Sequence, residues 1–337
     1  EGHKVDDKSE PLENAVFGLF TADCVKFSRD TAIMTAASDE NGCFEFTDVP
    51  FGQYIVREIE SPRGYILSDK EYAVSIAEDG EVIEITAENK PVTVEISKRD
   101  VYGNELAGAE MVLENADGEI VDKWTSDDTN HVVSKLGAGE YVLKEIAAPD
   151  GYVIATDIKF TVDVYGNITV ENVEATVTSE NGNPLIVMVD DTTKVQISKQ
   201  DITTGEELPG ATLQIIDEDG NVVEEWVSTD EAHFIEGKLI AGKEYTLKEI
   251  IAPEGYEIAN EIKFTVNADG TVTEVVMYDE HTPDLETPPT VTIDTPNTGV
   301  SADNSAELYL VAAAVIMAFG MVICKRNDKE QRKDDVK

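Results

Sequence analysis

Cysteine is scarce in this chain. Only three of the 337 residues are cysteine, and two of them, Cys24 and Cys43, fall in the first 91 residues. We expect these two to be free or partly buried thiols, and a disulfide between them is the alternative. No cluster of cysteine, histidine or carboxylate residues has the spacing of a metal site, so we predict neither a metal nor a cofactor. His131 and His233 precede strand-like runs at corresponding places, and we interpret them as structural.

Positive charge is also in short supply. The sequence has 26 Lys and Arg residues against 69 Asp and Glu residues, which gives a formal net charge of -43. Nucleic-acid binding is excluded because this charge repels phosphates. An acidic exterior that keeps an extracellular protein soluble explains the composition. Calcium binding by Asp-rich turns such as residues 217–221 is the alternative, although no complete EF-hand spacing is present.

Helical periodicity and enzyme motifs are missing as well. No long 3.6-residue period occurs before residue 307, and no Ser/His/Asp set, phosphate loop or exposed carboxylate pair is present, so we predict that the chain is not an enzyme. Short β-branched and aromatic runs alternate instead with turn dipeptides, which we interpret as hairpin turns of an all-β fold. These dipeptides are Asp79-Gly80, Asp117-Gly118, Asp219-Gly220 and Asp269-Gly270.

The chain repeats itself. Lys98 and Lys199 are 101 residues apart, and Trp124 and Trp226 are 102 apart, so two near-copies follow a more divergent first unit. Such a period indicates tandem domains. The sequence therefore predicts an all-β fold of three tandem Ig-like β-sandwich domains, at residues 1–91, 92–191 and 192–281.

Each repeat contains a glutamate on the apolar face of a predicted strand. Successive strand side chains alternate between faces, so Glu58, Glu145 and Glu249 share the faces of nearby Tyr, Val and Leu residues. Glutamate is almost never fully buried without a partner. A repeated inward carboxylate therefore requires a chemical reason.

The same alternation supplies partners for these glutamates. A lysine lies on the apolar face of the first strand of each repeat, and an Asn or Asp lies on the apolar face of the last strand. The three predicted sets are Lys4–Glu58–Asn89, Lys98–Glu145–Asp190 and Lys199–Glu249–Asp279.

Two interpretations of these sets remain open. The first is a buried salt bridge, which rarely stabilises more than hydrophobic packing does. The second is a covalent link, because burial lowers the pKa of lysine and raises that of a carboxyl group. A neutral amine, a protonated Glu as proton shuttle and an Asn or Asp acceptor are the components of an isopeptide bond.

The sequence around the glutamates resembles a known family. Residues 144–152 and 248–256 read Lys-Glu-Ile-x-Ala-Pro-x-Gly-Tyr, and residues 205–213 read Gly-Glu-Glu-Leu-Pro-Gly-Ala-Thr-Leu. These runs resemble the SpaA/CnaB-type prealbumin-like domains of Gram-positive surface proteins and pilins. The resemblance covers roughly residues 1–281. It implies intramolecular Lys–Asn or Lys–Asp isopeptide bonds whose formation is assisted by the Glu of this box.

The C-terminal part has the composition of a membrane anchor. Residues 308–324 form an uncharged apolar run long enough to predict a transmembrane helix. Residues 325–337 are rich in Lys and Arg, as expected for a cytoplasmic tail. The Thr- and Pro-rich residues 282–299 are expected to form an extended linker through the cell wall.

A short motif precedes the apolar run. Its residues are Thr295, Pro296, Asn297, Thr298 and Gly299. The order of motif, apolar span and basic tail resembles an LPxTG-like sorting signal. The resemblance implies that sortase cuts after Thr298 and joins it to an amine of peptidoglycan or of a pilus subunit.

The sequence therefore predicts a protein displayed on the cell wall of a Gram-positive bacterium, as a stalk, a pilin-like subunit or an adhesin base. The strand-like start at Glu1 leads us to expect the C-terminal portion of a longer protein. The absence of a Tyr-Pro-Lys motif favours a basal, tip or monomeric role over a polymerised shaft. The alternatives are an adhesin that binds host matrix or glycan, and the stem of a surface-displayed enzyme.

Overall fold

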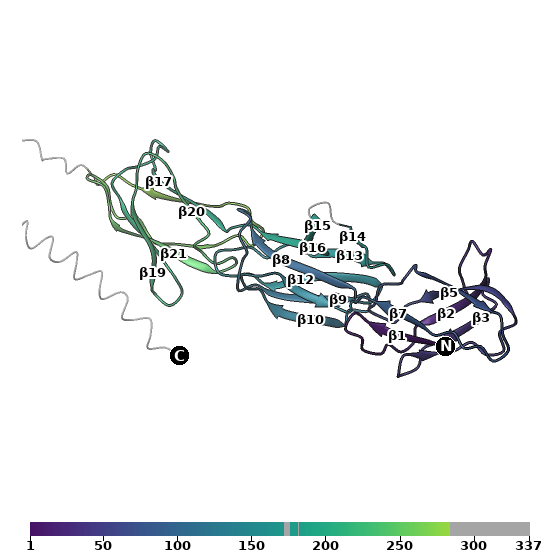
Figure 1. Cartoon of the computed structure of the whole chain (residues 1–337). Coiled ribbons are helices and arrows are strands. Elements are labelled where there is room, and N and C mark those ends of the chain that lie inside the picture. The colour runs from purple at the N-terminus through teal and green to yellow at the C-terminus, as the bar shows by residue number, and fades with distance from the viewer. Residues whose placement is uncertain (172–175, 181, 284–337) are drawn as a thin grey trace, which may run out of the picture. The chain divides into compact units, whose positions relative to one another are not determined.

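The computed structural model describes residues 1–171, 176–180 and 182–283. The chain is all-β across these residues, with 23 strands and no helix (Figure 1). The predicted fold class is therefore confirmed for this part of the chain. Burial alternates along many strands, as at Ile158–Val162, because successive side chains point to opposite faces of a sheet.

The first domain packs a small sheet against a larger one. The strands are β1 (Gly2–Asp6), β2 (Val16–Thr21), β3 (Met34–Ala37), β4 (Cys43–Phe44), β5 (Gly52–Glu60), β6 (Glu71–Ile76) and β7 (Ile85–Asn89). Their orders are β4-β1-β7 and β3-β2-β5-β6. Phe17 and Phe44 stack between the two sheets with their ring centroids 3.9 Å apart. This packing buries the core of the domain.

The second domain has the same two-sheet arrangement, with one more strand at the edge of each sheet. The strands are β8 (Thr93–Asp100), β9 (Glu110–Asn115), β10 (Ile120–Thr125), β11 (His131–Ser134), β12 (Gly139–Ala147), β13 (Ile158–Val162), β14 (Ile168–Val170), β15 (Thr176–Glu180) and β16 (Asn183–Asp190). Their orders are β11-β8-β16-β15 and β10-β9-β12-β13-β14. Strands β15 and β16 form an antiparallel hairpin at the edge of the smaller sheet.

The third domain repeats the arrangement. The strands are β17 (Lys194–Asp201), β18 (Thr212–Ile216), β19 (Val222–Val227), β20 (His233–Glu236), β21 (Glu244–Ile251), β22 (Ile262–Thr265) and β23 (Thr273–Asp279). Their orders are β20-β17-β23 and β19-β18-β21-β22. Trp226 stacks on His233 with centroids 4.4 Å apart, as Trp124 does on His131 at 4.0 Å. This packing agrees with a structural role for both histidines.

The pairing of the first and last strands of each domain positions the three predicted sets of lysine, glutamate and Asn or Asp. The first strand of each domain lies parallel to the last strand in the same sheet: β1 with β7, β8 with β16 and β17 with β23. Parallel neighbours cannot be joined by a hairpin, so the chain builds the opposite sheet between them. The first and last strands of each domain therefore lie side by side, and the chain enters at one end of this pair and leaves at the other.

Two of the four Asp-Gly turns differ from the prediction. Asp117-Gly118 and Asp219-Gly220 do join paired strands, β9–β10 and β18–β19. Asp79-Gly80 and Asp269-Gly270 instead lead from one sheet to the other, because β6 and β22 do not pair with the strands that follow them. The hairpin interpretation was wrong there: Asp-Gly supplies the positive φ of a tight turn, 75° at Gly80, whether or not the flanking strands pair.

Several predictions fall outside the described residues. These are the linker at residues 282–299 from residue 284 on, the sorting motif at residues 295–299, the apolar run at 308–324 and the basic tail at 325–337. The part of the chain that is described contains no helix long and apolar enough to span a membrane. Cys24 and Cys43 are both free thiols.

Candidate functional site

The parallel strand pair places each lysine next to its acceptor. Lys98 on β8 is in register with Met188 on β16, and Asp190 lies two residues further along. Residues two apart share a face, so the Lys98 and Asp190 side chains both point into the sandwich. The same offset joins Lys4 to Asn89 and Lys199 to Asp279.

The glutamates come from the opposite sheet. Glu58 lies on β5, Glu145 on β12 and Glu249 on β21. They face the lysines across the core, and none of the nine predicted residues is more than 4% exposed. The structure thus brings together the three members of each predicted set in a water-excluded interior.

The second and third domains have nearly identical geometry. Lys98 Nζ lies 3.2 Å from Glu145 Oε2 and also contacts Asp190 Oδ1. Lys199 Nζ lies 3.3 Å from Glu249 Oε1 and contacts Asp279 Oδ1. In both domains a single amine therefore touches two carboxyl groups.

The first domain is arranged differently. Lys4 Nζ lies 3.4 Å from Glu58 Oε1. The same oxygen accepts a hydrogen bond from Asn89 Nδ2 at 2.9 Å. Glu58 therefore stands between the amine and the carboxamide, in contact with both.

Burial changes the acid–base properties of these groups. Desolvation lowers the pKa of Lys98 to about 8, and the nearby Glu145 opposes that shift. Desolvation likewise lowers the pKa of Lys4. It raises the pKa of Glu58 and of Glu249, against the attraction of the adjacent lysines. Both shifts favour the neutral forms, a free amine and a carboxylic acid, because a charge in a dry interior loses its hydration.

The acceptor groups have buried oxygens without hydrogen bonds. Within the described residues, Asp190 Oδ2, Asp279 Oδ2 and Asn89 Oδ1 find no donor. A buried polar atom without a partner costs about 1–3 kcal/mol. If the Cγ of either Asp forms an amide with the lysine, one of its two carboxyl oxygens leaves as water. The geometry therefore suits condensation as well as ion pairing.

Each glutamate is held by a backbone N–H group that could not be predicted from side-chain alternation. The backbone N–H of Ala155 donates to Glu145 Oε2 at 2.7 Å, that of Ala259 to Glu249 Oε2 at 2.6 Å, and that of Ser68 to Glu58 Oε2 at 2.9 Å. Each donor lies ten residues after its glutamate, beyond the Pro-x-Gly-Tyr turn. This constant spacing was the available signal. In the first and third domains this bond fixes one carboxyl oxygen and leaves the other to face the lysine, whereas in the second domain Lys98 contacts the same oxygen, Glu145 Oε2.

Metal-binding geometry is not found near these sets. In residues 1–171, 176–180 and 182–283, no three His, Cys, Asp or Glu side chains are placed to hold a metal ion. Asp217, considered above for calcium, uses its Oδ1 to accept the backbone N–H groups of Asp219 and Asn221. Its carboxylate therefore stabilises the β18–β19 turn.

The fold and the repeated buried sets define a class of tandem β-sandwich repeats with an amine, an acid and an acyl acceptor in each core. The chain belongs to the SpaA family of prealbumin-like fold domains, whose family model matches residues 1–91, 92–183 and 193–281. No curated protein matches the chain.

Several solved structures are similar to this chain. The Bacillus anthracis TIE protein is 27% identical with a TM-score of 0.39, over 83% of this chain and 50% of that one. BcpA, the major pilin subunit of Bacillus cereus, is 15% identical with a TM-score of 0.33, over 83% of this chain and 98% of that one. The shaft pilin SpaA of Lactobacillus rhamnosus GG is 14% identical with a TM-score of 0.27, over 57% of this chain and 98% of that one. This chain thus spans about half the length of the TIE protein chain that it matches.

Proposed function

We propose that this chain is a cell-surface stalk or pilin-like protein whose domains are stabilised by intramolecular isopeptide bonds that they form themselves. The observation that carries the proposal is the contact of each buried lysine with a buried acid, next to an acyl acceptor on the neighbouring strand. A role as a salt bridge alone leaves the unpartnered acceptor oxygens unexplained. In the second and third domains, an amide removes both the Lys and the Asp charge and one oxygen of the Asp.

The reaction in the second domain is a condensation. The neutral Lys98 amine attacks Cγ of Asp190, and Glu145 as a carboxylic acid polarises the acceptor carbonyl. Glu145 then carries a proton from the new C–N bond to the departing hydroxyl, and one water leaves. Lys199, Glu249 and Asp279 take the same roles in the third domain.

In the first domain, the side-chain amide of Asn89 is replaced by an amide between Asn89 and Lys4. Lys4 attacks Cγ of Asn89, the bond from Cγ to Nδ2 breaks, and ammonia leaves. Glu58 Oε1 lies 2.9 Å from Asn89 Nδ2, in position to deliver the proton that the leaving nitrogen requires. Each reaction occurs once during maturation, so we do not class the protein as an enzyme.

The location of the bonds suits a load-bearing role. Each bond would join the first strand of a domain to its last, for example β8 to β16. Tension applied at the two ends of the domain would then pass through the amide rather than through the hydrogen bonds of the intervening strands. A stalk or pilin-like subunit under shear would benefit from this arrangement.

The mass of the folded protein tests the covalent proposal. Complete linkage removes two waters and one ammonia from the mass of the 337-residue chain. We expect Glu145→Ala and Glu249→Ala each to restore one water, and the exposed Glu140→Ala on the same strand as Glu145 to restore nothing. An unaltered mass of the parent chain would reject the covalent version and leave buried salt bridges.

We further propose that sortase anchors the protein through Thr298, with peptidoglycan or a pilus subunit as the accepting partner. Support comes from the order of sorting motif, apolar run and basic tail in the sequence. The apolar run would hold the chain in the membrane until the cut, and the mature protein would lie outside the cell wall. Release of a Thr298→Ala variant into the medium is expected, and equal wall retention of variant and parent would count against anchoring.

A further inference from the structure

A small cavity reaches the buried lysine in the second and third domains. In the second domain its volume is about 100 Å³, and Lys98, Trp124 and His131 are among the residues that line it. The corresponding cavity of the third domain has a volume of about 120 Å³ and is lined in the same way by Lys199 and His233. Cavities of this size with polar walls have room for water. Each cavity therefore joins a histidine to a lysine of the buried sets.

Each histidine is held between the cavity and solvent. The His131 ring stacks on Trp124 with centroids 4.0 Å apart, and its Nε2 lies 2.8 Å from Asp122 Oδ2. His233 Nε2 likewise lies 3.5 Å from Glu224 Oε1. The two histidine side chains are 29% and 30% exposed. Histidine is the side chain that most readily takes up and releases a proton near neutral pH. Each ring can therefore take a proton from solvent and release it into the cavity.

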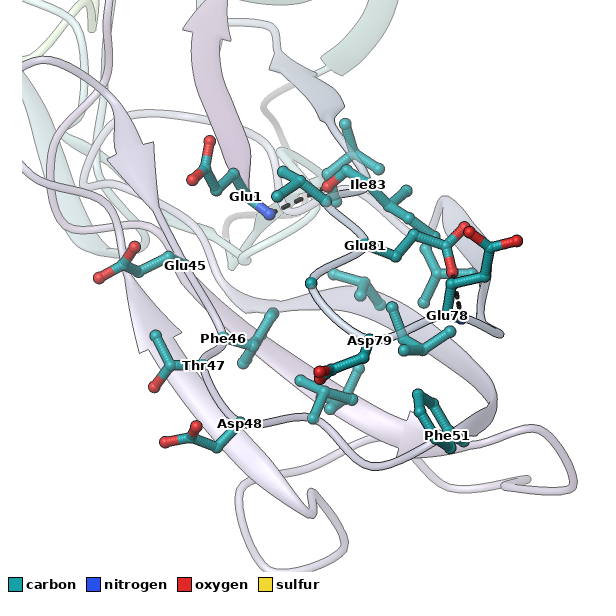
Figure 2. Close-up of a pocket in the computed structure, with 18 of the residues that line it drawn as sticks. Glu1, Glu45, Phe46, Thr47, Asp48, Phe51, Glu78, Asp79, Glu81 and Ile83 are labelled. Carbon is teal, nitrogen blue, oxygen red and sulfur yellow. Dashed lines mark hydrogen bonds between the residues drawn. The ribbon is translucent and has the colours of Figure 1, made fainter.

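The first domain differs at this place. Phe44 is the counterpart of His131 by strand register, because their partners Gly2 and Ile96 each precede the lysine of their set by two residues. The ring of Phe44 lies against Gly2 and has no proton to exchange. The cavity of this domain that Figure 2 shows is lined by acidic and apolar residues, and Lys4 is not part of its wall.

The number of buried acids differs between the domains in the same way. In the first domain one amine, Lys4, faces one acid, Glu58, so the ion-paired set is neutral. In the second domain Lys98 faces two acids, Glu145 and Asp190, so the ion-paired set has an excess negative charge. Condensation requires a neutral amine and two carboxylic acids, because a carboxylate is a poor acceptor. That state contains one proton more than the ion-paired state. A proton must therefore enter the core of the second domain before the amide forms.

We propose that His131 in the second domain, and His233 in the third, supply this proton through the adjoining cavity. This inference rests on the proposed isopeptide chemistry and adds a proton donor to it. In the second domain the donor is the imidazolium of His131, which becomes neutral. Of its proton and the three ammonium protons of Lys98, one remains on the amide nitrogen and one on Glu145. The other two leave with an oxygen of Asp190 as water.

Replacement of His131 by Gln separates proton supply from packing. Gln can still donate a hydrogen bond to Asp122, but it cannot carry a proton. The full chain is made by cell-free synthesis, and mass spectrometry of proteolytic peptides follows the linked fraction of each domain with time. We expect the link between Lys98 and Asp190 to form about 100-fold more slowly, at the lower end of what a positioned acid contributes. The third domain should keep the parent rate and serves as the internal reference.

A matched control and chemical rescue distinguish this role from a structural one. Val132→Gln, at an exposed position on the same strand, should leave the rate of linkage unchanged. His131→Ala leaves space beside Trp124 for a free azole. Added imidazole should raise the rate of linkage in this variant about tenfold or more, because it carries a proton as histidine does. Pyrazole has the same size but is a far weaker base, and it should not.

The outcomes divide as follows. Slow linkage in His131→Gln, with rescue of His131→Ala by imidazole alone, supports the proposal. Linkage of His131→Gln at the parent rate overturns it. Slow linkage that neither azole relieves, or that both relieve equally, assigns the loss to packing and overturns it as well. If His131→Ala does not fold, the same substitutions at His233 repeat the test in the third domain. A parent chain without any mass loss rejects the isopeptide chemistry itself, and this inference with it.

Discussion

Replacement of Glu145 by Gln is the most direct test of how the second domain gains its stability. Gln has nearly the same shape as Glu and can still accept the N–H of Ala155, which lies 2.7 Å from Glu145 Oε2. It cannot act as the carboxylic acid that shuttles the proton. We therefore expect a folded second domain without the link between Lys98 and Asp190.

The magnitude follows from the length of the loop that the link closes. Lys98 and Asp190 are 92 residues apart in sequence. The chain-entropy model developed for disulfides assigns a cross-link of this span about 4–5 kcal/mol, because the link restricts the unfolded chain. In a domain of this size, that loss lowers Tm by roughly 20–35 °C.

Calorimetry of the full chain combined with intact mass is the suitable assay. Glu145→Gln should gain one water in mass and lower the transition of the second domain, while the other transitions stay in place. Glu140→Gln, on the exposed face of the same strand, should change neither quantity. If Glu145→Gln lacks the link yet unfolds at the parent temperature, the entropic argument is wrong; if it forms the link, the role assigned to Glu145 is wrong.

Three further predictions concern the same chemistry. After refolding from denaturant, the link in the second domain should form more slowly as the pH rises above about 8. Above the Lys98 pKa of about 8 the neutral amine hardly increases further, whereas the carboxylic acid that the reaction also needs becomes scarcer; time-resolved mass spectrometry measures this. Asn89→Asp should change the mass loss that accompanies linkage in the first domain from one ammonia to one water. If the peptides that contain residues 4 and 89 show no mass loss in either protein, linkage in the first domain is refuted. Ala155→Pro removes the N–H that holds Glu145 and should lower the yield of the link, whereas Ala155→Gly should keep it, as peptide mapping would show.

Much of the fold could be predicted from alternation alone. A two-residue period in side-chain type indicates a strand and says which face is apolar, so Glu58, Glu145 and Glu249 could be assigned to the interior from the sequence. The repeat offsets then gave the number of domains. Both signals are local or periodic, and neither requires knowledge of which strands are neighbours.

The backbone donors and the course of the chain after two of the Asp-Gly turns could not be predicted from alternation. Ser68, Ala155 and Ala259 act through their main-chain N–H groups, which every residue except proline has, so their side chains carry no signal. Asp79-Gly80 could not be distinguished from a hairpin turn, because its dihedral angles are the same whether the next strand joins this sheet or the opposite one.

The sequence by itself determined that three β-rich units each contain an inward amine, an inward acid and an inward acceptor. Only the tertiary structure decided that Lys98 and Asp190 lie on adjacent parallel strands with Glu145 opposite. The physical reason is that the face of a side chain depends on its own strand, whereas its neighbours depend on pairings between strands about 90 residues apart.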